Sequence, residues 1–106
     1  MDAIFRALAD ATRRDIVMRV LVEGQSVSGL AERYAMSFAA VQKHVAVLER
    51  AGLVTKHPRG REVRVVGNVE TVRRATALLE EMERLWRTRF DQIGDLLATL
   101  DPGDDP

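Results

Sequence analysis

Residues 37–54 combine a helical spacing of hydrophobic positions with an outer face of small and mostly uncharged side chains. Val41, Val45 and Leu48 follow i, i+4, i+7 spacing, so they lie on one face of a predicted helix. The opposite face carries Phe38, Ala39, Gln42, Lys43 and Ala46, with His44 at its edge. An ordinary surface helix presents charged residues there. This outer face is therefore unusual for a surface that meets only water.

Three shorter helices precede this one in the predicted structure. The first covers residues 3–9, and its apolar side consists of Ile4, Phe5 and Leu8. Thr12 is predicted to cap the second helix, with Asp15 completing a capping-box-like pair, and Gly24 is predicted to end it. The apolar face of the second helix consists of Ile16, Val17, Val20 and Leu21.

The third and fourth helices are predicted to follow each other after a tight connection. Ser26 caps the third helix, and its buried positions are Val27, Leu30 and Ala31. Ala35 and Met36 make the connection, Ser37 caps the fourth helix and Gly52 ends it.

The hydrophobic pattern then changes to two short β-branched runs, residues 53–57 and 62–66. Pro58 and Gly60 lie between these runs and predict a hairpin turn, and Gly67 and Asn68 close the hairpin. Two helices joined by a tight turn and followed by a hairpin are typical of a winged helix-turn-helix.

A long helix is predicted over residues 69–100. Apolar residues recur in it every seven positions, at Val72, Leu79, Trp86, Ile93 and Leu100, and Met82 and Leu96 belong to a second row. Arg89 interrupts that second row, and Phe90 lies beside the gap. The sequence thus predicts one domain over residues 1–100, mainly α with a small β-hairpin in the order α-α-α-α-β-β-α. Residues 101–106, an acidic stretch with two prolines, are expected to be disordered.

A helix-turn-helix explains the unusual face of the fourth helix, because a helix in the major groove must bring its outer face close to base edges. Gln42 can donate to and accept from adenine, and Lys43 can reach guanine or a phosphate. The hydroxyl of Ser37 suits a phosphate contact at the helix start. The hairpin tip places Arg59 and Arg61 where a wing would reach the DNA backbone or minor groove.

The formal net charge is zero, but the charges are unevenly distributed. Residues 37–67 contain six basic and two acidic residues, a net charge of +4, whereas residues 68–106 contain five basic and nine acidic residues, a net charge of −4. A local positive field matters more to a polyanion than the whole-chain sum. The alternative interpretation is a basic surface that is simply solvated.

The composition points to a cytoplasmic protein without cofactors. The 106 residues include no cysteine, which excludes disulfides and thiolate metal ligands. No apolar run approaches the roughly 20 residues of a membrane span, and the N-terminus does not resemble a signal peptide. An enzyme is not expected, since no cysteine nucleophile, P-loop, dinucleotide-binding glycine pattern or Ser-His-carboxylate set is evident.

Four stretches resemble the ArsR/SmtB family of winged-helix repressors: ALADATRRDIV, VSGLAERY, SFAAVQKHV followed by VLERAGLV, and the wing sequence PRGRE. The resemblance covers residue 3 to about residue 97. It implies a homodimeric transcriptional repressor that binds double-stranded DNA, with the fourth helix reading the DNA and the first and last helices forming the dimer. The DNA-binding residues would be Ser37, Phe38, Ala39, Gln42, Lys43, His44, Arg59 and Arg61. The dimerisation residues would be Ile4, Phe5, Leu8, Leu79, Met82, Trp86, Phe90 and Ile93.

The apolar surface of the last helix independently favours a dimer, because it exceeds what a domain of this size can easily cover. The alternative is that Leu79, Trp86 and Ile93 pack on their own domain. A two-fold dimer would place two recognition helices roughly 34–36 Å apart and predicts a pseudo-palindromic operator.

Departures from the family pattern bear on sensing and specificity. The third helix lacks the family's cysteine motif and the last helix lacks histidine, while His44 and His57 have no ligand partner at i+3 or i+4. No metal site is therefore expected. Phe38 stands where the family usually has Gln, and Gln42 where it has Ser, so an operator cannot be carried over by analogy. Ala35 stands near a usual Gly, which suggests a turn without a left-handed residue.

Three functions are compatible with these observations. The first is a metal-independent repressor that regulates its own operon, as in the family branch that this chain resembles. The second is an effector- or metal-responsive sensor on the same fold, with no small-molecule effector identified. The third is a winged-helix module that binds protein or RNA, which net neutrality supports.

Overall fold

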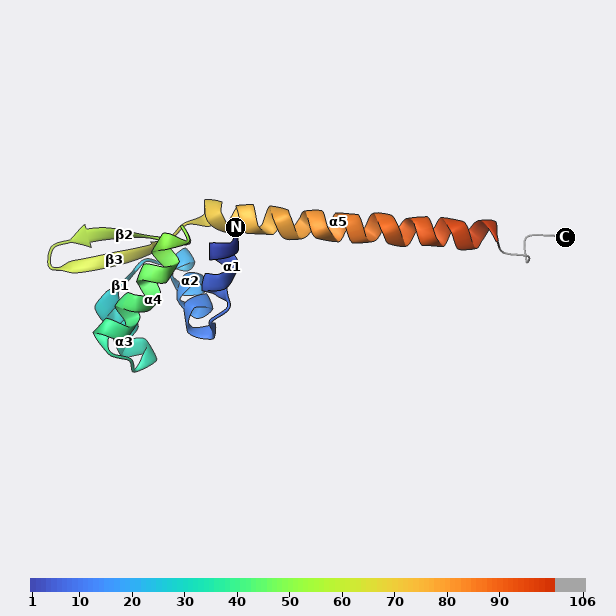
Figure 1. Cartoon of the computed structure of the whole chain (residues 1–106). Coiled ribbons are helices and arrows are strands. Elements are labelled where there is room, and N and C mark those ends of the chain that lie inside the picture. Colours follow the sequence, from blue (N-terminus) through green and yellow to red (C-terminus); the bar gives the residue numbers. More distant parts are fainter. Residues whose placement is uncertain (101–106) are drawn as a thin grey trace. The chain divides into compact units, whose positions relative to one another are not determined.

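The computed structural model describes residues 1–100, which fall into two units, Met1–Ala75 and a second unit that begins at Thr76. The elements in chain order are α1 (Asp2–Leu8), α2 (Ala11–Val22), β1 (Gln25–Ser26), α3 (Val27–Tyr34), α4 (Phe38–Arg50), β2 (Val54–Arg59), β3 (Glu62–Gly67) and α5 (Val69–Thr99) (Figure 1). This order confirms the predicted mainly α fold with a hairpin and adds one short strand, β1. The expected disorder of residues 101–106 lies outside the described residues.

The core of the first unit is aliphatic and draws on all of its helices and on strands β2 and β3. Val41, Val45 and Leu48 are fully buried, as the helical spacing predicted. The buried apolar residues are Ile4, Ala7, Ile16, Val17, Val20, Val27, Leu30, Val41, Val45, Leu48, Leu53, Val54, Val65 and Ala75. One prediction of burial is wrong in degree, because Ala31 is only half-buried. Leu21, which was placed on the apolar face of α2, is 37% exposed at the edge of that helix.

The predicted cap of α2 was wrong by two residues. Asp10, not Thr12, has extended backbone and accepts a hydrogen bond from the backbone N–H of Arg13 at 2.9 Å. Thr12 lies inside the first turn of α2. Asp10 is the cap because it directly precedes the helix, where its carboxylate reaches the free N–H groups of the first turn. The helix also ends at Val22, two residues before Gly24, with extended backbone at the intervening position.

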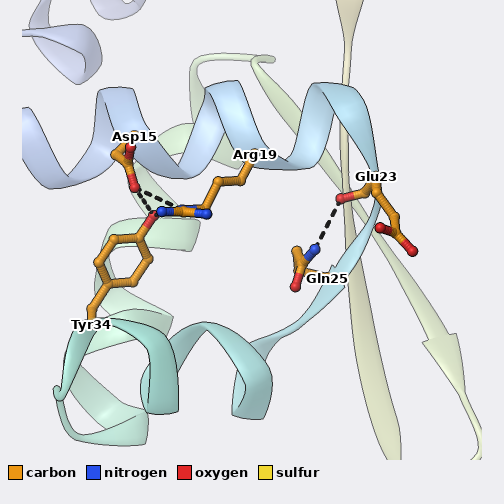
Figure 2. Close-up of polar contacts among 5 residues, drawn as sticks. All are labelled: Asp15, Arg19, Glu23, Gln25 and Tyr34. Atoms are coloured by element: carbon orange, nitrogen blue, oxygen red, sulfur yellow. Dashed lines mark hydrogen bonds and ion pairs between the residues drawn. The ribbon is translucent and has the colours of Figure 1, made fainter.

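Asp15, the expected partner of Thr12, instead belongs to a polar cluster with Arg19 and Tyr34 (Figure 2). Its carboxylate accepts from the Tyr34 hydroxyl and from Nε of Arg19, the latter at 2.8 Å, while Arg19 also donates to the Tyr34 oxygen at 3.1 Å. The hydrogen bond from Tyr34, followed by that from Arg19, lowers the pKa of Asp15 below its ordinary value of 3.8. The cluster ties α2 to the end of α3.

A Tyr34→Phe variant is expected to raise the pKa of Asp15, because it removes the hydrogen bond that lowers this pKa most. A carboxylate with a depressed native pKa stabilises the fold above the unfolded-state value of about 3.9 and loses that contribution as pH falls through the native value. The loss of stability in the variant should therefore be largest near neutral pH and become smaller as pH falls through the native pKa of Asp15. Carboxyl-carbon NMR titration with urea unfolding at several pH values checks this; an unchanged Asp15 pKa would contradict it.

The connection between α3 and α4 closes through a left-handed residue, contrary to the expectation. The predicted caps Ser26 and Ser37 are confirmed, with side chains that accept from the N–H groups of Gly29 and Ala40 at 3.0 and 3.1 Å. Ala35 has φ 53° and ψ 41°, and this conformation lets the next N–H, that of Met36, reach the Ala31 carbonyl at 3.1 Å. A helix that ends with this bond needs a left-handed residue at this position whether or not it is glycine.

An Ala35→Gly variant is expected to be more stable than the native protein by roughly 0.5–1 kcal/mol, because glycine avoids the clash of Cβ in the left-handed region. Urea unfolding of the two proteins measures the difference. Ala77 is a matched control, since it is exposed within α5, and Ala77→Gly should lower stability by about 1 kcal/mol. A loss of stability at Ala35 would contradict the left-handed assignment.

The wing consists of β2 and β3 and projects from the helices of the first unit (Figure 1). Arg59 pairs with Glu62, so the turn contains only Gly60 and Arg61, and Gly60 has the positive φ of 63° expected at the first position of such a turn. Pro58 was predicted to lie in the turn but belongs to β2. The strand tolerates it because the sheet order is β1-β3-β2, which makes β2 an edge strand.

Candidate nucleic-acid interface

The outward face of α4 is accessible, with the side-chain character that its sequence predicted. Phe38, Ala39, Gln42 and Lys43 are exposed, while Ala46 is half-buried further along the helix. These residues recur every three to four positions and therefore form one face, opposite the buried Val41, Val45 and Leu48. The face is low in bulk and carries hydrogen-bonding groups at Gln42 and Lys43, as a surface for base edges requires.

The start of α4 offers an additional polar group. The Ser37 oxygen accepts from the backbone N–H of Ala40, and its own hydroxyl proton remains available for a phosphate oxygen. The predicted role of Ser37 in phosphate binding is therefore compatible with its role as a cap.

The wing tip presents two arginines in an exposed position. Arg59 and Arg61 flank Gly60, and across residues 1–100 neither side chain has an ion pair or hydrogen bond. Lys43 on α4 is likewise without an ionic partner in the described part of the chain. Their positive charges are therefore available to a phosphate backbone.

A groove lined by residues of α3, α4 and the wing was not predicted. Its lining residues are Val27, Gln42, Val45, Ala46, Lys56 and Val63. Lys56 lies on β2 and pairs with Glu49 of α4, with 3.3 Å between Nζ and Oε1. The excess of basic residues in this stretch could have pointed to Lys56, but only the folded hairpin brings it next to Gln42.

The two histidines occupy different environments. His44 is half-buried and close enough to Asp10 for its charge to help lower the pKa of that carboxyl, an effect smaller than that of the hydrogen bond from Arg13. His57 is exposed on β2, with Nε2 2.9 Å from the Thr55 hydroxyl. Within residues 1–100, no group of three or more His, Cys, Asp or Glu residues is arranged to hold a metal ion.

The residues predicted for dimerisation differ in how much surface they can offer. On α1, Ile4 is only 3% exposed and belongs to the core of its own unit, so only the half-buried Phe5 and Leu8 have surface to spare. Ile4 therefore has little surface to offer to a second chain. On α5, the exposed large apolar residues of the predicted set are Leu79, Met82, Trp86, Phe90 and Ile93. The Trp86 and Phe90 ring centroids are 6.3 Å apart, and an ion pair between Glu81 and Arg84 occupies the opposite side of the helix.

Comparison with known proteins identifies the family. The model described as "Bacterial regulatory protein, arsR family" matches residues 10–56, from the cap of α2 into β2. The HTH-type transcriptional regulator Rv2034 of Mycobacterium tuberculosis is 35% identical over 104 residues, which cover 98% of this chain and 92% of that protein. The chain belongs to the ArsR family.

Solved structures agree with this assignment to the ArsR family. An ArsR-like transcriptional regulator from Rhodococcus sp. RHA1 has a TM-score of 0.79 at 32% identity, covering 90% of each chain. A homodimeric winged helix-turn-helix DNA-binding domain, Mb0332 of Mycobacterium bovis, has a TM-score of 0.64 over 78% of this chain and 77% of that chain. Its identity is 22%, so this second likeness concerns the fold alone.

This ArsR-family protein is therefore a transcriptional regulator with a DNA-binding winged helix-turn-helix, as the sequence motifs predicted. Its relatives are regulators rather than enzymes, in agreement with the absence of catalytic motifs. Among the described helices, none has the length and apolar character needed to cross a membrane.

Proposed function

We propose that this protein is a homodimeric repressor that binds a pseudo-palindromic operator in its own promoter region, without a metal ion, in the cytoplasm. The observation that carries this proposal is the combination of the low-bulk outer face of α4 with two wing-tip arginines that have no ion-pair partner among residues 1–100. Gln42 and Lys43 would read bases, while Ser37, Arg59 and Arg61 would bind the backbone. Repression would follow because a dimer on the operator occludes the promoter.

Dimerisation is supported by the exposed apolar row of α5 and by the homodimeric state of the Mb0332 domain. Isolated apolar residues are common on protein surfaces, but a continuous row of this size marks an interaction site. In the proposed dimer, Trp86 and its neighbours meet their counterparts on the second chain, and Phe5 and Leu8 contribute from α1. Two-fold symmetry then sets the two copies of α4 about one DNA turn apart.

Metal independence is supported by the donor chemistry of the chain. The sequence has no cysteine, and the two histidines lie on different elements, His44 on α4 and His57 on β2, where Nε2 of His57 is 2.9 Å from the Thr55 hydroxyl. Neither arrangement provides the three or four convergent ligands of a regulatory metal site.

Fluorescence anisotropy in EDTA tests the proposal. A duplex from upstream of the protein's own gene should bind on the order of 10³-fold more tightly than a scrambled duplex. In a transcription assay, the protein should reduce transcript from that promoter. Equal binding to both duplexes would contradict sequence-specific binding and favour a protein-interaction module. Specific binding only after Zn²⁺ addition would contradict metal independence, and increased transcript would contradict repression.

A further inference from the structure

Phe38 is the aromatic residue of the first unit that does not pack into the core. The other two, Phe5 and Tyr34, lie against the hydrophobic core, whereas Phe38 is 48% exposed. A single exposed aromatic side chain is common on protein surfaces and requires no partner by itself. What distinguishes Phe38 is its place, because it is the first residue of α4 and follows the cap Ser37.

The surroundings of Phe38 leave its ring open on the reading face. Ala39 is too small to cover it, and Gln42 lies one helical turn further along the same side. The N-terminal residues of a recognition helix are those that contact base edges in the major groove. A ligand that meets Gln42 there therefore also meets the Phe38 ring.

The chemistry of the ring restricts what it can recognise. A phenyl group offers neither a donor nor a conventional acceptor, so it cannot form the hydrogen bonds that distinguish adenine, guanine and cytosine. In the major groove, the apolar group of a normal base pair is the C5-methyl of thymine.

We propose that Phe38 determines operator specificity by packing on the C5-methyl group of a thymine in each half-site, beside the base pair that Gln42 reads. This inference rests on the proposed function, since it requires α4 to lie in the major groove. Phe38 would thus contact bases through an apolar ring where the family usually has Gln. Thymine would be the preferred base at one defined position of the operator.

Deoxyuridine, which is thymine without the methyl group, tests the proposal on the native protein. A binding duplex is first selected by the native protein from a random-sequence library, and each thymine is then replaced by deoxyuridine in turn. At one thymine per half-site, the replacement should weaken binding about fourfold, the effect expected for one buried methyl group. If native protein binds the thymine and deoxyuridine duplexes equally at every position, the proposal is overturned.

Protein variants then assign the effect to Phe38. Phe38→Ala should bind the thymine and deoxyuridine duplexes equally, whereas Gln42→Ala should bind both more weakly but keep the fourfold difference. Val22→Ala is a matched control, because Val22 is an 88% exposed apolar residue on α2 and should leave affinity and discrimination unchanged. Retained discrimination in Phe38→Ala would assign the methyl contact to another residue and overturn the proposal.

The outcomes separate this inference from the proposed function on which it rests. Selection that enriches no duplex would overturn both. Strong, sequence-specific binding without any effect of deoxyuridine would overturn the role of Phe38 alone and leave the proposed regulator intact.

Discussion

A Trp86→Glu variant is expected to be monomeric at micromolar concentrations and to bind operator DNA at least about 100-fold more weakly than the native protein. Trp86 is 64% exposed on α5, within the row of Leu79, Met82, Phe90 and Ile93. A buried Trp side chain removes about 150–250 Å² from water, which corresponds to about 4–6 kcal/mol at 25 cal/mol per Å². Glu would place a charge where each chain of the proposed dimer meets the other, twice by symmetry.

The loss of DNA affinity follows from the loss of linkage between two half-sites. In a dimer, binding of one recognition helix holds the second near its half-site at high effective concentration, which raises affinity by about 10²–10⁴-fold. A monomer binds each half-site separately and loses this factor. The α4 surface itself is unchanged by the substitution, so the weak intrinsic binding of a single half-site should remain.

Sedimentation velocity and anisotropy measure the two effects. Thr88→Ala is the control on the same helix, since Thr88 is polar and its hydroxyl donates to the Arg84 carbonyl rather than belonging to the apolar row. Trp86 is also the single tryptophan of the chain, so dilution of the native protein should shift its emission to longer wavelength as the dimer dissociates. A Trp86→Glu protein that remains dimeric would contradict the role of this face.

Replacing both Arg59 and Arg61 with Ala is expected to weaken binding to operator and random DNA alike, by about tenfold or more at physiological salt. The wing tip carries these two guanidinium groups without ion-pair partners among residues 1–100. Each phosphate contact that is lost lowers the slope of log affinity against log salt by about 1, so a dimer lacking four such contacts should lose about 4. Because phosphates carry no sequence information, the ratio of operator to random affinity should change little.

Arg84→Ala is a control for the wing variant, because it also removes an exposed arginine. Arg84 is an exposed arginine on α5 whose Nε lies 2.9 Å from Oε2 of Glu81, outside the proposed DNA surface. It should leave the salt slope unchanged. A wing variant with the native salt slope would show that Arg59 and Arg61 do not contact phosphates.

Much of the first unit was predictable because its determinants lie within one helical turn of each other. The spacing of Val41, Val45 and Leu48 is a local pattern, and their burial was predicted from it. Ser26 and Ser37 cap their helices by accepting a hydrogen bond from the backbone N–H three residues later in the chain, a spacing that is visible in the sequence. The hairpin and the long last helix were predicted for the same reason.

The predictions that were wrong have a common physical cause: contacts between residues distant in the sequence replaced the local interactions that were predicted. Asp15 was assigned to a local cap, but Tyr34, 19 residues away, takes its carboxylate. Strand β1 exists only because β3 is there to pair with Gln25 and Ser26. Pro58 was assigned to the turn, but the pairing of Arg59 with Glu62 extends the strand past it.

The same division applies to the candidate interface. The sequence by itself determined which residues form the outer face of α4 and where basic residues are concentrated. It also determined that apolar residues recur every seven positions along α5. Only the tertiary structure decided that Lys56 pairs with Glu49 beside Gln42, that Ile4 is buried in the core and that Ala35 takes the left-handed conformation. Periodicity and capping depend on neighbours within about four residues. Pairing, burial and turn strain depend on which distant segment packs against each residue, and that is settled only when the chain has folded.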